Sequence, residues 1–164
     1  RQRQMCIRDR FAIQRLGGRK VTKDEAREVL KRSEEAGLIH MSMNTTEDVG
    51  FICNCDRWHC VSVKQALAKP KPALYFYSGF EPRFEAERCV ACGTCLERCP
   101  GEALSLGQEG PPQVDRDRCF GCAVCATGCP SDAIAMVSRP GFPEIPKNGR
   151  ALGEAIKASR SIGA

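Results

Sequence analysis

Cysteine spacing is the feature of this sequence that points most directly to chemistry. The 164 residues contain 12 cysteines, and eight of them stand in two runs, CVACGTCLERCP from Cys89 and CFGCAVCATGCP from Cys119. Each run reads C-x2-C-x2-C-x3-C-P. Three thiolates spaced by two residues can sit on one tight loop and hold three corners of an iron–sulfur cubane. The fourth cysteine lies on the next turn and points away, and the proline after it ends the local helical turn.

This cysteine run resembles that of bacterial two-cluster ferredoxins, in which the fourth cysteine of each run binds the cluster of the other. The resemblance implies two [4Fe–4S] clusters with crossed ligands. The ligands of the first cluster are then Cys89, Cys92, Cys95 and Cys129. Those of the second are Cys119, Cys122, Cys125 and Cys99.

The two runs belong to an internal repeat with an offset of 30 residues, in which Arg88 matches Arg118 and Ala103 matches Ala133. Such a repeat predicts two copies of one small unit related by a pseudo-twofold axis. Each unit would consist of a strand, a cluster loop, a short helix and a second strand. We therefore expect an α+β, ferredoxin-like domain with small antiparallel strand pairs, preceded by a mostly helical segment.

Disulfides, zinc and plain structural burial are the alternatives to clusters for these cysteines. A disulfide framework is typical of a secreted chain, and no signal peptide is visible. A zinc site prefers two separated C-x2-C knuckles and would leave the third cysteine of each run without a role. Buried structural cysteines would not repeat at a fixed spacing. Small residues around the cysteines let the backbone approach a cluster, and an apolar shell would limit its contact with water. We expect that shell to contain Val90, Leu96, Leu104, Phe120 and Ile134.

Composition and charge exclude further classes of function. The formal net charge is +5, but four arginines and one aspartate lie in the first ten residues, RQRQMCIRDR. Two oxidised clusters with their thiolates would add a charge of about −2 each. Nucleic-acid binding is therefore not expected. No apolar run approaches the length of a membrane span, and no G-x-G-x-x-G loop or catalytic triad stands out. We expect a cytoplasmic protein without an activity of its own.

The first ten residues show no apolar periodicity, and MCIRDR resembles translated sequencing-adapter DNA. We interpret them as a non-native segment joined to a fragment, and we exclude Cys6 from every site. The remaining chain is predicted to divide into a helical segment with a cysteine group, a ferredoxin domain, and a Pro-rich linker with a terminal helix. These parts cover residues 11–80, 81–138 and 139–164.

Two helices can be predicted from their ends. Thr22 and Glu25 form a capping box that begins a helix over 23–36, with Gly37 at its C′ position. Asn148 can cap a second helix over 149–160.

A further group of potential ligands lies in the stretch FICNCDRWHC. Its three thiols and one imidazole are Cys53, Cys55, Cys60 and His59. They could bind zinc as a Cys3His site, supply ligands to a third iron–sulfur cluster, or remain thiols without a metal near a redox partner.

The stretch EEAGLIHMSMN, followed by FICNC and then the repeat, resembles a group of iron–sulfur proteins from anaerobic prokaryotes. Members share an EEAGLVH stretch, an ICNCC-type cysteine group and a C-terminal two-cluster ferredoxin domain. This chain has Asp56, Trp58 and His59 where many members carry further cysteines. The resemblance implies an electron-transfer protein that relays single electrons at low potential to or from a redox partner protein. The alternative is a component of an oxidoreductase in which Cys53, Cys55 and Cys60 form a further metal site.

Overall fold

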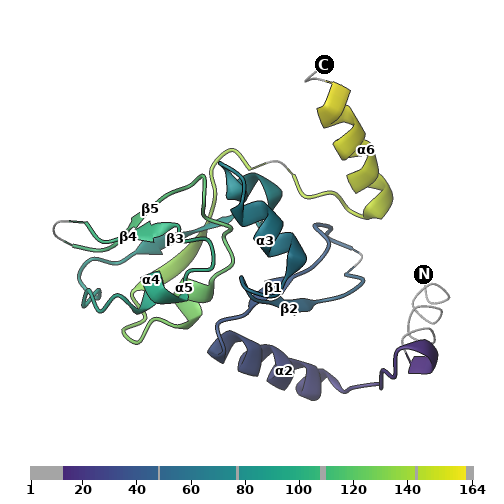
Figure 1. The fold of residues 1–164 in the computed structure, drawn as a ribbon, viewed down its shortest axis with the longest axis horizontal. Helices are drawn as coiled ribbons and strands as arrows, with labels where there is room; N and C mark the ends of the chain where they lie inside the picture. The colour runs from purple at the N-terminus through teal and green to yellow at the C-terminus, as the bar shows by residue number, and fades with distance from the viewer. Residues whose placement is uncertain (1–12, 48, 77, 108–109, 143, 162–164) are drawn as a thin grey trace. The chain divides into compact units, whose positions relative to one another are not determined.

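The computed structural model describes residues 13–47, 49–76, 78–107, 110–142 and 144–161 (Figure 1). The first ten residues, including Cys6, lie outside the described residues. The chain forms two compact units, Arg1–Arg32 and Ser33–Ala164. Within the described ranges, no helix has both the length and the apolar character needed to cross a membrane.

Helix α2 (Lys23–Glu35) begins at the predicted capping box. The Thr22 backbone N–H donates to Glu25 Oε2 at 2.7 Å, and the Glu25 N–H donates to Thr22 Oγ1 at 3.1 Å. These bonds satisfy two N–H groups that a helix start leaves without partners. The helix ends one residue earlier than predicted, and Gly37 then takes a φ of +75°, which is the left-handed conformation of a C′ glycine.

A short hairpin and a helix follow α2. Strands β1 (Ile39–Met41) and β2 (Cys53–Cys55) pair antiparallel, so that Ile39 faces Cys55. Helix α3 (Val61–Leu67) comes next, and a 3-10 turn, η1 (Pro72–Tyr75), leads into the cysteine-rich part.

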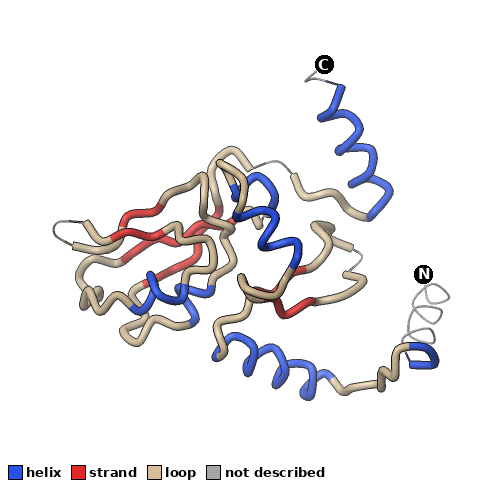
Figure 2. The backbone as a smooth tube through the Cα atoms, in the orientation of Figure 1, coloured by secondary structure: helices blue, strands red, loops and turns tan. Residues whose placement is uncertain are grey.

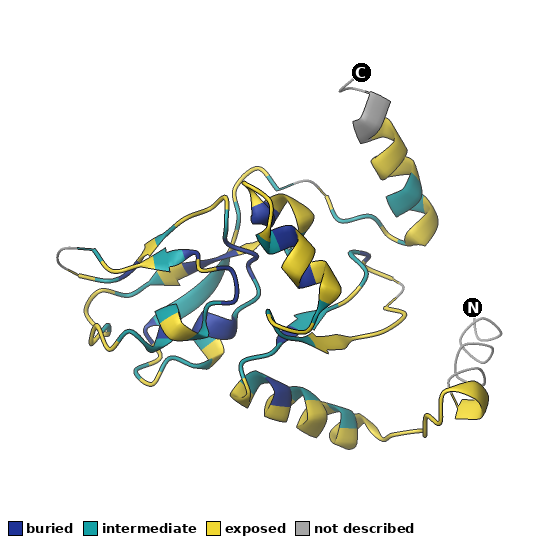
Figure 3. Cartoon of the chain, in the orientation of Figure 1, coloured by how far each residue is buried: buried dark blue, intermediate teal, exposed yellow. Residues whose placement is uncertain are grey.

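The buried core joins this region to the second cysteine run. Its buried members are Ile39 of β1, Val63 of α3, Phe120 and Val124. The Phe76 ring meets Phe120 edge-to-face at 4.9 Å between centroids. Figure 3 shows the buried residues of α3 on one side of the helix and exposed residues on the other. Residues upstream of the ferredoxin-type part therefore share one core with it.

The cysteine-rich part has mixed helices and small antiparallel strand pairs, as expected of an α+β iron–sulfur domain (Figure 2). Strand β3 (Phe80–Phe84) pairs with β6 (Ile134–Ser138), and β4 (Leu104–Ser105) pairs with β5 (Gln113–Val114). The strand before each cysteine loop thus pairs with the strand after the other loop. Helices α4 (Thr94–Arg98) and α5 (Val124–Thr127) each follow a cysteine loop.

The last described helix is α6 (Gly149–Ser161), and the Ala151 N–H donates to the predicted cap Asn148 Oδ1 at 3.1 Å. The segment before this helix is bound to the loop after β1. There the Thr46 N–H donates to the Pro146 carbonyl at 3.0 Å, and the Glu47 N–H donates to the Lys147 carbonyl at 2.8 Å.

Candidate metal centres

The two cysteine loops have matching backbones. Positions equivalent in the repeat share a positive φ, and the three pairs are Ala91 with Gly121, Gly93 with Ala123, and Glu102 with Asp132. Four of these residues are not glycine, and a left-handed conformation costs such a residue about 1–2 kcal/mol. A loop accepts this strain where the surrounding structure fixes its path. Here the path brings three cysteines of each run to one side.

The fourth cysteine of each run reaches the other loop. One cavity is lined by Cys89, Cys92 and Cys95 together with Cys129. A second is lined by Cys119, Cys122 and Cys125 together with Cys99. Each cavity is therefore lined by one of the two sets of four cysteines that the sequence predicts. Four thiols, small loop residues and an apolar surround form a donor set that fits a [4Fe–4S] cluster.

Backbone N–H groups point at the sulfurs of both crossing cysteines. The Ala103 N–H donates to Cys99 Sγ at 3.3 Å, and the Ala133 N–H donates to Cys129 Sγ at 3.4 Å. Hydrogen bonds to a ligating sulfur orient it and raise the reduction potential of the iron it binds, because they stabilise negative charge.

The two candidate centres differ in their exposure to solvent. In the second centre Cys119 and Cys125 are buried, whereas in the first centre Cys95 is buried but Cys92 is exposed. Burial raises the pKa of the free Cys122 and Cys125 thiols to about 12, while the Thr94 hydroxyl lowers the pKa of Cys92. A metal must therefore displace protons from the inner thiols when it binds them.

The apolar residues around the two centres differ in solvent exposure, as the cysteines do. Phe120 is 5% exposed, but its repeat counterpart Val90 is 67% exposed. Val90 lines the first cavity as expected of a shell residue, but its exposure means that it shields that centre less than Phe120 shields the second. The upstream segment packs on the second loop through Ile39 and Val63, and no described residue buries Val90 in the same way.

A charged group beside the second loop could not be read from the sequence. Glu81 of β3 is 8% exposed, and its carboxylate lies 2.7 Å from Arg116 Nη2 and 3.7 Å from Arg139 Nε. Arg139 Nη2 also donates to the Cys119 carbonyl at 3.1 Å. Arg139 therefore contacts the second cysteine loop from outside, and together with Arg116 it places two guanidinium groups beside the buried Glu81 carboxylate.

Arg98 connects both cysteine runs to the upstream segment. It lies in the first run, and its Nε donates to the Val124 carbonyl in the second run at 3.3 Å. Its two terminal nitrogens donate to the carbonyls of Glu34 at 2.7 Å and Glu35 at 3.3 Å, at the end of α2. A guanidinium is suited to this role because it presents several donors in one plane.

The third group of cysteines lies on β2 and at the start of α3. Burial, together with the neighbouring thiols of Cys60 and Cys53, raises the pKa of the Cys55 thiol to about 12. The backbone N–H of Val63 lowers the pKa of Cys60. Cys53 and Cys60 thus both neighbour Cys55.

His59 has a different partner. Its Nδ1 lies 2.7 Å from Asp56 Oδ2, and its side chain is 87% exposed. Among the described residues, no three His, Cys, Asp or Glu side chains are arranged to hold a single metal ion. His40, a lone histidine in the sequence, bonds instead to Asn54 across the hairpin at 2.8 Å.

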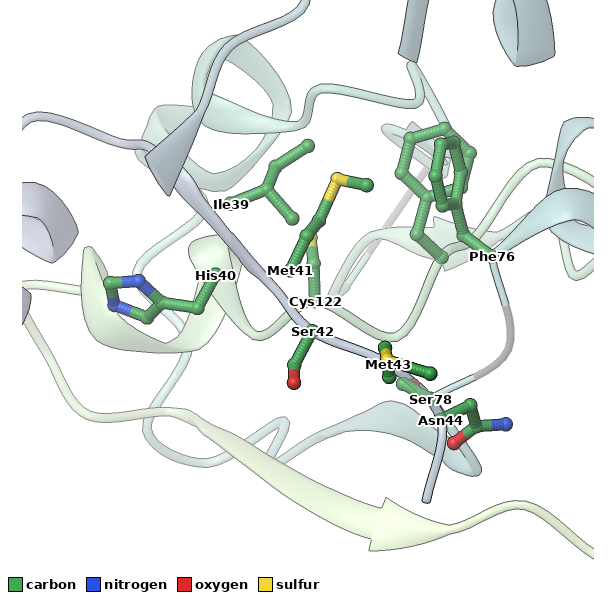
Figure 4. A pocket seen from close by; sticks show the side chains of 10 residues that line it. Ile39, His40, Met41, Ser42, Met43, Asn44, Phe76, Ser78 and Cys122 are labelled. Atoms are coloured by element: carbon green, nitrogen blue, oxygen red, sulfur yellow. The ribbon is translucent and has the colours of Figure 1, made fainter. Parts of the chain in front are cut away.

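A cavity of about 220 Å³ opens between the segment after α2 and the second cysteine loop. Figure 4 shows Met41, Met43 and Phe76 around it, with Cys122 behind Met41 and the His40 ring on the other side of the strand. The cavity is lined by both apolar and polar residues, and it reaches Cys122 of the second centre from the upstream side.

Comparisons with known proteins bear on the cysteine-rich part of the chain. No curated protein matches the sequence. Residues 83–136 match the family model of the 4Fe-4S dicluster domain. This stretch contains both cysteine runs and most of the two strand pairs around them, and it is similar to ferredoxin-type iron–sulfur domains.

Proposed function

We propose that this chain carries two [4Fe–4S] clusters and relays single electrons at low potential between redox partners, as an electron-transfer module of an oxidoreductase system. The observation that supports this most directly is the composition of the two four-cysteine cavities. Each takes three cysteines from one run and one from the other. Crossed ligation of this kind keeps two clusters within one small domain.

The clusters would supply the one-electron chemistry, and the protein residues would hold and insulate them. The crossing cysteines accept N–H bonds from Ala103 and Ala133, and Phe120 limits contact of the second centre with water. The matching loop conformations also support a pseudo-twofold relation between the halves.

Metal analysis and spectroscopy of two matched variants test the proposal. Protein reconstituted without oxygen should contain about eight irons and eight sulfides per chain. The Cys99→Ala variant should lose the EPR signal of the cluster at Cys119, Cys122 and Cys125, and the Cys129→Ala variant should lose the other. Selective loss in the opposite sense would disprove the crossing. About four irons in the unaltered chain would disprove the two-cluster proposal.

The further metal site at Cys53, Cys55 and Cys60, with or without His59, stays a prediction of the sequence. The same analysis tests it with a Cys53→Ala, Cys55→Ala double variant. One zinc, or about four irons beyond the eight, present in the unaltered chain and lost in the double variant, would establish that site.

A further inference from the structure

We propose that Cys55 and Cys60 form a redox-active dithiol–disulfide pair that takes up two electrons from the iron–sulfur centres. This inference rests on the proposed function, since the centres are the reductant. Electron relay through the two centres alone gives the thiols of Cys55 and Cys60 no role, and this inference assigns them one.

The contacts of Cys55 select the pair. Its thiol neighbours that of Cys60, and both side chains pack against the same buried cluster. Cys53 is also near, but it stands two positions away on the same strand, and its side chain therefore points in the same direction as that of Cys55. Strand residues at this separation lie roughly 6.6 Å apart with parallel Cβ vectors, which is a poor geometry for a disulfide. Cys60 approaches Cys55 from a different element.

A turn held by one carboxylate brings Cys60 back towards β2. Asp56 Oδ1 accepts from the backbone N–H groups of Trp58 and His59, each at 2.6 Å. The chain therefore reverses within the four residues between Cys55 and Cys60. Both cysteines are half-buried, whereas Cys53 is exposed.

The pair packs on the core that also contains a ligand of the second centre. Cys55, Cys60 and Cys122 all pack against the buried cluster formed by Ile39, Val63, Phe120 and Val124. Among the residues that the structure describes, neither Val90 nor a cysteine of the first centre belongs to this core. The second centre is therefore the one placed to exchange electrons with the pair.

The two electrons needed to reduce the disulfide equal the number that the two centres can supply together. Reduction of the Cys55–Cys60 disulfide breaks one S–S bond, consumes two electrons and two protons, and yields two thiols. Each bound cluster would supply one of these electrons and be oxidised in doing so. Disulfides of redox enzymes have higher reduction potentials than low-potential iron–sulfur clusters. The transfer is therefore downhill.

An anaerobic reductive titration of the cluster-loaded chain tests the inference. Protein oxidised mildly with diamide is titrated with titanium(III) citrate. The absorbance of the clusters at about 400 nm is followed during the titration. Because the disulfide accepts electrons first, the unaltered chain should show a lag of about two electron equivalents before the absorbance falls. Cys60→Ser should abolish the lag. Cys53→Ser is the matched control and should keep it.

Mass spectrometry of alkylated peptides supplies a readout that does not depend on the clusters. A Cys55–Cys60 linkage should appear after oxidation and disappear after the lag. Absence of this linkage in protein that shows both cluster EPR signals would overturn the inference and leave the proposed function intact. Protein without cluster signals would contradict the proposed function instead. Iron or zinc bound by these cysteines, measured as metal lost in Cys60→Ser, would also overturn the inference.

Discussion

Arg98 gives the sharpest test of how the upstream segment is attached to the cysteine-rich part. Arg98→Ala removes one short bond of 2.7 Å to Glu34 and two longer bonds of 3.3 Å to Glu35 and Val124. A bond from a charged donor contributes about 1.5–3 kcal/mol, and the longer bonds fall below that range. Water can reach the freed carbonyls at the end of α2, which limits the penalty. We therefore expect the local opening of this junction to become easier by about 2–3 kcal/mol.

Hydrogen exchange measures that opening directly. The Gly37 N–H bonds to the Glu34 carbonyl and the Leu38 N–H to the Ser33 carbonyl, both at 2.9 Å, so both amides report on the end of α2. At about 1.4 kcal/mol per factor of ten, their exchange should be faster by roughly 30- to 150-fold in Arg98→Ala. Arg98→Lys should fall between, because an ammonium cannot reach all three carbonyls.

The matched control is Arg88→Ala. Arg88 lies near the same cysteine run and pairs with Glu85 at 3.3 Å, but both side chains are largely exposed. Such a pair contributes about 0.5 kcal/mol or less, so exchange at Gly37 and Leu38 should stay unchanged. If these two amides exchange at the same rate in Arg98→Ala and Arg88→Ala, the three bonds from Arg98 do not hold the junction.

Three further predictions concern the centres. Gly121→Ala should destabilise the folded chain by about 3–5 kcal/mol in chemical denaturation, because a Cβ there meets Ser78 Oγ and the Phe80 carbonyl oxygen. Gly93→Ala, with no atom near its Cβ, should destabilise it by only about 1–2 kcal/mol, and equal losses in the two variants would contradict this prediction. Controlled ferricyanide oxidation should destroy the centre that includes the exposed Cys92 first, as followed by EPR, and simultaneous loss would contradict the difference in burial. Protein-film voltammetry should place both cluster couples well below about −200 mV, and couples at positive potential would exclude a low-potential carrier.

Local sequence patterns predicted much of this structure because the interactions behind them are local. The capping box at Thr22 and the cap at Asn148 each connect residues three apart, so their partners can be read directly from the chain. The convergence of Cys99 and Cys129 on the opposite loops is a long-range feature. It was predictable because the cysteine spacing resembles a known motif, and spacing alone would not have determined it.

Contacts between distant segments could not be predicted in this way. Arg98 bonds to Glu34 across 64 residues, and nothing in the run CLERCP distinguishes this arginine from an exposed one. Glu81 looks like a surface residue next to a strand, yet it is buried between two arginines. The exposure of Val90 was missed for the same reason, since the repeat gives both loops one pattern and only the upstream segment makes them different.

This difference between the loops has a consequence for the direction of electron flow. An electron moves readily over a short path through packed protein and slowly across solvent gaps, so the exposed centre is the natural contact for an outside partner. That centre includes Cys92, which is exposed. The buried centre at Cys119 and Cys125 has the core, the 220 Å³ cavity and the Cys55–Cys60 sulfurs beside it instead. Under the proposed function, the symmetric repeat would therefore act as an asymmetric relay, in which the first centre would face a partner protein and the second the chain's own upstream segment.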